Sequence, residues 1–264
     1  APARADLRDL REQLAAALLD AQALVAWTSG FTFPTFDMPR EYVALRAGND
    51  YPMERGRIVS THGLDIDVTA FNDHFVEEQA PHSTALHARL RERGTYFVGP
   101  LARYALNFDR LDAATRELAR ATGVVPPVDN PFRSIVIRAL EVHFACAEAI
   151  RIIDGYGPPA RSFVEPTRAS GIGHGVTEAP RGLLYHRYRV ADDGLIELAQ
   201  ITPPTSQNQR AVEEDLAAYV TPRLHLPQDE LCWQCEQAIR NYDPCISCAT
   251  HFLSLDVRRG GAAP

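Results

Sequence analysis

The sequence lacks a long apolar run, a signal segment and an excess of basic residues. It contains no window of about 18 consecutive apolar residues, so we expect no membrane-spanning helix. Residues 1–22 lack the charged-then-apolar pattern of a signal peptide, which favours a cytoplasmic protein. The chain has 27 basic and 34 acidic residues, a net charge of -7 and no basic stripe, so we expect it to bind no nucleic acid.

The chain does contain enough apolar residues to build a sizeable core. Its 264 residues are 45% hydrophobic, which is compatible with one large domain or two modest ones. Apolar spacing and breakers predict helices over residues 5–26, 101–122, 131–153, 211–220 and 231–240. Short strands are expected at EYVAL and GRIVS within residues 31–64, and a β-hairpin turns at DDG within residues 168–198. The expected fold class is mainly α with small β elements (α+β).

The helix predicted over residues 131–153 is apolar around most of its circumference, which indicates a helix buried inside a bundle. Its charged and polar interruptions are Arg138, Glu141, His143 and Glu148. Because buried charges are costly unless paired, we expect Arg138 to pair with Glu141 or with a carboxylate on a neighbouring helix. Cys146 on the same helix is expected to be a buried core thiol.

Three histidines lie between residues 68 and 90, namely His74, His82 and His87. Their spacings of eight and five suit no single helix face. We therefore interpret them as surface or loop histidines and predict no metal site there.

Two loop-like stretches precede the C-terminal helices. Gly171, Gly173 and Gly175 would let the backbone approach a neighbour closely, and Arg181 follows on a stiff Pro-Arg-Gly segment. No following helix is expected to supply an N-terminal dipole, so we reject a nucleotide site. ITPPTSQNQR, residues 201–210, is expected to form a rigid turn with hydrogen-bonding side chains.

The most informative stretch is NYDPCISCATH, residues 241–251. Four of the five cysteines form C-x-x-C pairs, Cys232 with Cys235 and Cys245 with Cys248, which suits metal or redox chemistry better than a disulfide framework. Three interpretations remain open. They are a closed four-thiolate zinc or iron-sulfur site, an open metal site that uses only Cys245 and Cys248, and incidental cysteines.

Three motifs, in order, carry a resemblance: GVTEAPRG, PPTSQN and DPCISCATH. Together they resemble the C-terminal half of the large (alpha) subunit of nickel-iron hydrogenases. The form RNYDPCISCATHF is similar to the cytoplasmic bidirectional NAD(P)-linked or sulfhydrogenase type. The resemblance implies a long helical-bundle core with small β elements.

The resemblance also implies site residues. Cys245 would be a terminal nickel thiolate and proton acceptor, and Cys248 would bridge nickel to an iron that carries cyanide and carbon monoxide. Arg181 would lie over the open site, with Asp243 orienting its guanidinium. Further ligands and donors would be Pro204 and Thr205 for the cyanide, and His251 with the Ile201 carbonyl for a structural magnesium or iron ion.

The implied function is heterolytic cleavage or formation of H2 at the nickel-iron centre. Electrons would pass to iron-sulfur clusters of a hydrogenase small subunit and on to NAD(P)-linked electron-transfer subunits. A maturation protease would cut after His251, so residues 1–251 are expected to form the large-subunit portion and residues 252–264 a removable extension.

One departure limits this prediction. The family's N-terminal Arg-x-Cys-x-x-Cys block and its proton-relaying glutamate do not occur here. We therefore expect a C-terminal portion of a large subunit that is inactive alone. Two alternatives are a metal-free, quinone-binding relative of the respiratory NADH dehydrogenase large subunit and a zinc-binding four-cysteine interaction module. Intact Cys245, Cys248 and His251 argue against the first.

Overall fold

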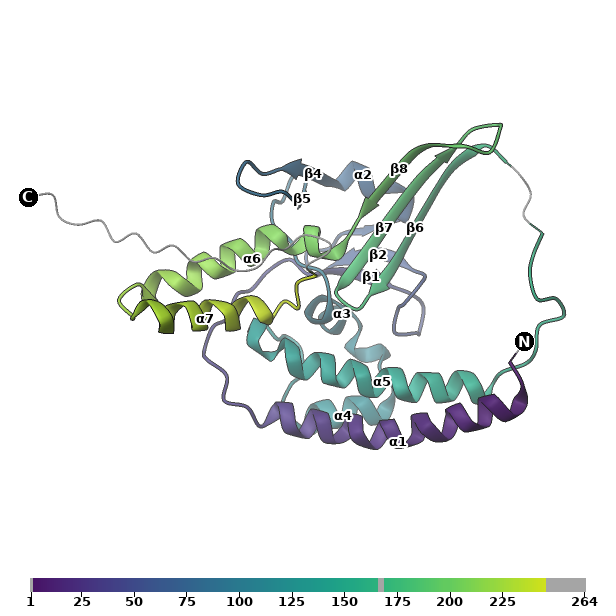
Figure 1. The fold of residues 1–264 in the computed structure, drawn as a ribbon, viewed down its shortest axis with the longest axis horizontal. Coiled ribbons are helices and arrows are strands. Elements are labelled where there is room, and N and C mark those ends of the chain that lie inside the picture. Colours follow the sequence, from purple (N-terminus) through teal and green to yellow (C-terminus); the bar gives the residue numbers. More distant parts are fainter. Residues whose placement is uncertain (1, 166–168, 246–264) are drawn as a thin grey trace, which may run out of the picture.

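The computed structural model describes residues 2–165 and 169–245, and the fold is mainly α with small β elements, as predicted (Figure 1). The α-helices are α1 (Arg4–Ser29), α2 (Phe71–His74), α3 (Pro100–Asn107), α4 (Ala113–Ala121), α5 (Ser134–Asp154), α6 (Pro204–Val220) and α7 (Gln228–Arg240). The strands are β1 (Val43–Arg46), β2 (Arg57–Ser60), β3 (Asp65–Ile66), β4 (Phe75–Gln79), β5 (Leu86–Leu90), β6 (Gly171–Ala179), β7 (Gly182–Val190) and β8 (Ile196–Thr202). None of the helices in this described part combines the length and apolar character that crossing a bilayer requires.

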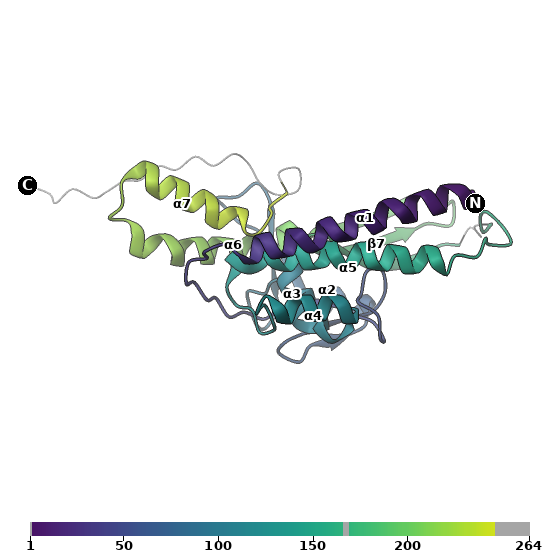
Figure 2. The same cartoon turned by 90° about the horizontal axis from the view of Figure 1, so that it is seen from below.

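Helices α1 and α5 lie side by side along the lower edge of the molecule, with α4 and α3 packed nearby (Figures 1 and 2). The predicted amphipathic helix at the N-terminus is confirmed as α1. Its buried contacts are concentrated near its C-terminal end, at Ala21, Val25 and Thr28. Leu10 and Leu19 are exposed, so much of its apolar stripe has no cover from the described residues.

The prediction that α5 is buried along its length is wrong for its second half. The side chains from Ser134 to Phe144 that face the core are buried, whereas residues 145–154 are half-buried or exposed. Cys146 is accordingly half-buried rather than a core thiol. The apolar circumference of α5 therefore exceeds what the described neighbours cover.

The strands form three small antiparallel sheets, ordered β1-β2-β3, β4-β5 and β6-β7-β8. One apolar cluster joins α1, α3, α4 and α5 to β1, and a second joins the three sheets to one another. The strands expected at EYVAL and GRIVS are confirmed as β1 and β2, and the expected hairpin is confirmed as β7 and β8. The sheets thus sit on the helical layer and carry the loops of the candidate site.

Two local predictions were wrong in the same region. The glycine-rich head is strand β6, paired along its whole length with β7, because glycine weakens a strand without forbidding it. Residues 201–210 are not a rigid turn either. Strand β8 ends at Thr202 and α6 begins at Pro204, since proline is well tolerated in the first turn of a helix. Helix α6 therefore starts earlier than the predicted residue 211.

The helix predicted over residues 101–122 is split. Helix α3 ends at Asn107, a 3-10 turn follows at Phe108–Arg110, and α4 begins after Asp112. The Asp112 carboxylate accepts hydrogen bonds from the backbone N–H groups of Ala114 and Thr115 and so caps α4. Two further 3-10 turns, Val68–Ala70 and Pro131–Arg133, precede α2 and α5, and a last one, Thr221–Arg223, follows α6.

Two glycines allow the β6–β7 turn to approach the start of α3. Gly99 has a φ of 111° and Gly182 a φ of 131°. A β-carbon on Gly99 would lie 2.6 Å from the Arg181 carbonyl oxygen, and one on Gly182 would lie 2.7 Å from the Gly99 nitrogen. Both positions require glycine, for conformation and for space.

Candidate functional site

The candidate site is built around one contact between segments far apart in the sequence. Arg181, in the β6–β7 turn, donates from Nε to the backbone carbonyl of Asp243 at 2.5 Å and lies 3.2 Å from Oδ2 of the same residue. Arg181 is about 35% exposed and Asp243 about 46% exposed in their side chains. This contact places the guanidinium two residues before Cys245 in the sequence.

The segment that carries Asp243 is held by three elements. Ser134 at the start of α5 donates to the Asn241 carbonyl at 2.5 Å. The Tyr242 hydroxyl donates to Asp215 on α6 at 2.5 Å, and Arg40 forms a buried ion pair with the same carboxylate. Burial raises the pKa of Asp215, an effect that Arg40 and Tyr242 oppose. The chain after α7 therefore reaches the site in a defined path.

The turn that carries Arg181 is held by a second arginine. Arg103 on α3 donates to the carbonyls of Ala179 and Pro180 at 2.7 and 2.8 Å. It also pairs with Glu141 on α5 and with Glu178 on β6. Glu141 therefore pairs with Arg103, so the expected pairing of Arg138 with Glu141 is wrong.

Electrostatics in this buried network are dominated by desolvation. Burial raises the pKa of Glu178 to about 7, although Arg103 and the N–H of Leu45 stabilise the carboxylate. The Tyr51 hydroxyl donates to Glu141 at 2.7 Å, and burial raises the pKa of this tyrosine well above its usual value. The network is a fixed support beneath the turn.

Arg138 lines the same pocket as Arg181 and Asp243, at the junction of α3, α5 and the end of α7. Burial lowers the pKa of Arg138, and the nearby Asp243 carboxylate opposes this shift. Among the described residues no ion pair within 4.0 Å involves Arg138. The sequence placed it on a helix face but gave no sign that it would meet Asp243.

The remaining predicted residues lie at different depths. Pro204 and Thr205 are buried in the first turn of α6, but neither lines the pocket of Arg181. Ile201 lies near the end of β8, opposite His186, and is 51% exposed. Cys248 and His251 lie outside the described residues.

Two residues of the PPTSQN motif have a role that the sequence did not reveal. Gln207 donates to the carbonyls of Leu183 and Thr202, and Asn208 exchanges two hydrogen bonds with the backbone of Val98. Both side chains are buried. They fix the first turn of α6 against β7 and the segment before α3, so Thr205 and Arg181 share one rigid frame.

The cysteines before the motif have separate environments. Cys235 is buried on α7 and burial raises its pKa, which favours an inert thiol, while Cys232 is half-buried. Within residues 2–165 and 169–245, Cys232, Cys235 and Cys245 do not gather into a set of three metal ligands. This geometry gives no support to a closed site built on all three.

Comparison with known proteins assigns a family to this arrangement. Residues 91–251 match the family model described as nickel-dependent hydrogenase. The chain is 27% identical to sulfhydrogenase 1 subunit alpha of Pyrococcus furiosus over 94% of its own length and 59% of that protein. It is 40% identical to the NAD-reducing hydrogenase HoxS subunit beta of Cupriavidus necator, over 33% of this chain and 19% of that protein.

A solved structure extends the similarity to the fold. The crystal structure of an NAD+-reducing [NiFe]-hydrogenase in the H2-reduced state superposes with a TM-score of 0.68 and 26% identity. The match covers 94% of this chain and 58% of that chain. The printed sequence therefore spans somewhat more than half the length of the relatives it matches.

Proposed function

This chain belongs to the nickel-dependent hydrogenase family, and from that premise we propose that it is the C-terminal portion of a nickel-iron hydrogenase large subunit that cleaves or forms H2. The observation that carries the proposal is the contact of Arg181 with Asp243, two residues before Cys245. It joins two of the three motifs at a half-exposed position where a small substrate can reach a guanidinium. An arginine that was merely structural would be saturated by protein partners.

A nickel-iron group fits these residues in kind. Soft thiolate sulfur is the ligand class that nickel and low-valent iron prefer, and Cys245 and Cys248 would hold the metals. Thr205 and the backbone near Pro204, buried at the start of α6, would donate hydrogen bonds to an iron-bound cyanide. His251 and the Ile201 carbonyl would hold a magnesium or iron ion.

When bound, the group would supply an open coordination position that polarises H2. Arg181 would direct its terminal N–H groups at the substrate, while Asp243 holds the Nε side of the guanidinium in place. The Cys245 sulfur would accept one proton as H2 separates. Complete oxidation releases two protons and two electrons, and the electrons would leave through iron-sulfur clusters of a small subunit towards NAD(P).

The donor set in this sequence is half complete. Two thiolates remain to be supplied by polypeptide outside the printed sequence, so we expect the chain to act only within a complex. The exposed apolar residues Leu10, Leu19, Val142 and Ile152 on α1 and α5 offer a surface for such polypeptide. Residues 252–264 would be removed by a maturation protease after metal loading.

The test is hydrogen isotope exchange in the native complex, which reports H2 cleavage without an electron acceptor. Arg181→Lys keeps the charge but loses the planar fork, and we expect exchange to fall by about 100-fold. Nickel and iron content should stay unchanged. Arg189→Lys on β7 is the matched control, because Arg189 pairs with Glu197 at the surface and should retain full exchange.

Unchanged exchange in Arg181→Lys would remove the arginine from the mechanism. Metal analysis addresses the proposal more broadly. Native protein that contains zinc bound by four thiolates, and neither nickel nor iron, would replace the hydrogenase assignment with the zinc module.

A further inference from the structure

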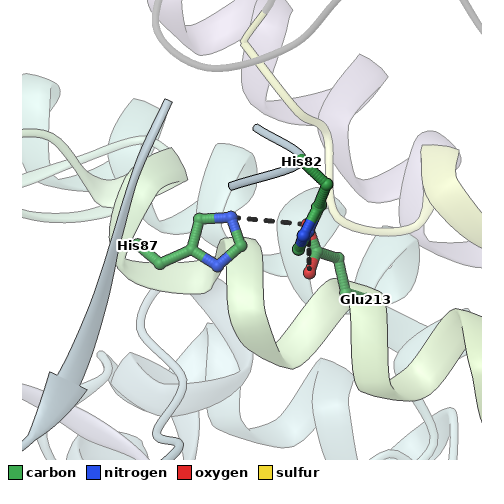
Figure 3. A group of neighbouring side chains, drawn as sticks. All are labelled: His82, His87 and Glu213. Carbon is green, nitrogen blue, oxygen red and sulfur yellow. Dashed lines mark hydrogen bonds and ion pairs between the residues drawn. The ribbon is translucent and has the colours of Figure 1, made fainter. Parts of the chain in front are cut away.

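Two of the histidines interpreted as surface residues meet a carboxylate from a distant helix. His82 lies in the loop between β4 and β5, His87 is on β5, and Glu213 projects from α6 (Figure 3). The three side chains point toward one another between the hairpin and the helix. Histidine and carboxylate ligands are the usual donors for zinc and related divalent cations.

The distances suit a tetrahedral ion. His82 Nε2 lies 3.2 and 3.1 Å from the two carboxylate oxygens of Glu213, and His87 Nε2 lies 3.4 Å from Oε1. One candidate ligand atom from each residue can be chosen so that all three lie within 4.8 Å of one another. Ligands about 2.1 Å from a tetrahedral zinc ion lie roughly 3.4 Å apart, so only a small closure between the two rings is needed.

A second, independent observation points to a ligand. The His87 side chain is 5% exposed, and its Nε2 atom has no hydrogen-bond partner among the described residues. Buried polar atoms are nearly always satisfied, and an orphaned one calls for an explanation. An ion between His87 and Glu213 would satisfy this atom at its own position.

The local charges also favour a cation. Arg210 pairs with Glu78 and Glu214, so the nearby guanidinium is already used by other carboxylates. Within the described ranges, the ion pairs of Glu213 are those with His82 and His87. With neutral imidazoles the group carries one negative charge, which a divalent cation offsets. Gln209 can hold the carboxylate, since its Nε2 donates to Glu213 Oε1 at 3.4 Å.

We propose that His82, His87 and Glu213 bind a zinc-class divalent cation, with water completing the tetrahedron. His82 is 66% exposed, so an ion can enter from solvent. The ion would clip the β4–β5 hairpin to α6, the helix whose first turn holds Thr205 and Asn208. The site is separate from the cysteine motif and does not depend on the proposed hydrogenase chemistry.

The test is titration of the purified full chain with Co2+, whose spectrum distinguishes its ligands. Binding by imidazole and carboxylate gives visible d–d bands without the near-ultraviolet charge-transfer band that thiolates produce. We expect one ion per chain in this sulfur-free form, displaced by Zn2+. His82→Ala should weaken its affinity by about tenfold or more. Because His82 is exposed, this variant should fold normally.

His62→Ala is the matched control, since His62 is also exposed and lies 3.6 Å from the single carboxylate of Glu41. It should leave the sulfur-free band unchanged. His87→Gln, checked for folding by circular dichroism, should lose the band as well. The proposal is overturned if cobalt gives only thiolate bands, or if the sulfur-free band persists unchanged in His82→Ala. Neither result would affect nickel content or isotope exchange, so the two proposals can fail separately.

Discussion

Arg103 and Arg181 lie on the two sides of the same turn, yet the protein uses them differently. All five N–H groups of Arg103 find acceptors, in Glu141, Glu178 and two backbone carbonyls, and the residue is 4% exposed. The hydrogen bonds of Arg181 within the described residues come from Nε alone. A saturated arginine serves as architecture, whereas an unsaturated one keeps donors for a ligand.

Removing the saturated arginine should have the largest effect on stability. Arg103→Ala leaves Glu178 and Glu141 buried without their cation, and we expect a loss of about 3–5 kcal/mol in the free energy of unfolding. Chemical denaturation measures it. Arg46→Ala is the control, because Arg46 pairs with Asp109 at the surface and should cost less than about 1 kcal/mol. Equal losses in the two variants would contradict the comparison.

The same network should give the protein a pH dependence. The folded pKa of Glu178, about 7, exceeds the usual value of 4.5, so the folded state binds the proton more tightly. The stabilisation is complete below about pH 4.5 and is lost as pH rises through 7, by up to roughly 3 kcal/mol. Unfolding measured from pH 4.5 to 8 should show this difference in slope between the wild type and Glu178→Gln. Parallel curves would mean that Glu178 remains ionised throughout.

On the Arg181 side, the anchors are individually weaker. Tyr242→Phe removes the hydrogen bond to Asp215 and leaves that carboxylate with Arg40, so we expect a loss of about 1–2 kcal/mol. Thermal unfolding should detect it. Tyr188→Phe, which loses only a bond to the half-exposed His186, is the control and should cost less. A larger effect for Tyr188 would show that the segment after α7 is not held through Asp215.

The smallest effect on stability is expected where the effect on activity is largest. Arg181→Lys should change the free energy of unfolding by less than about 1 kcal/mol, since the residue is partly exposed and its ion pair is with the half-exposed Asp243. Denaturant unfolding of the variant measures this against Arg103→Ala. Destabilisation comparable to that of Arg103→Ala would make Arg181 a second structural residue and erase the distinction.

Periodicity predicted the longer elements well and the connections poorly. α1, α5 and α7 lie close to their expected bounds, because their apolar spacing extends over several turns. The single helix over residues 101–122 failed because Asp112 competes as an N-cap, a local hydrogen bond that outweighs continued helix. α6 was placed too late because two prolines suggested a turn.

The site divides in the same way. Motifs named Arg181 and Asp243, but Arg103, Arg138 and Gln207 owe their roles to contacts with distant segments that no local pattern records. The histidine cluster shows this most clearly. His82 and Glu213 are 131 residues apart, so spacing among the histidines alone carried no information about their partner.

The facing glycines at positions 99 and 182 have one further consequence. Where two backbones touch with no β-carbon between them, the smallest possible mutation, a single added methyl group, would force the Arg181 turn outward. Evolution could retune the surroundings of this arginine through many neighbouring side chains, but the seat on which its turn rests has no gentler variant to explore. Drift in this family should therefore be slowest at two residues that carry no chemistry of their own.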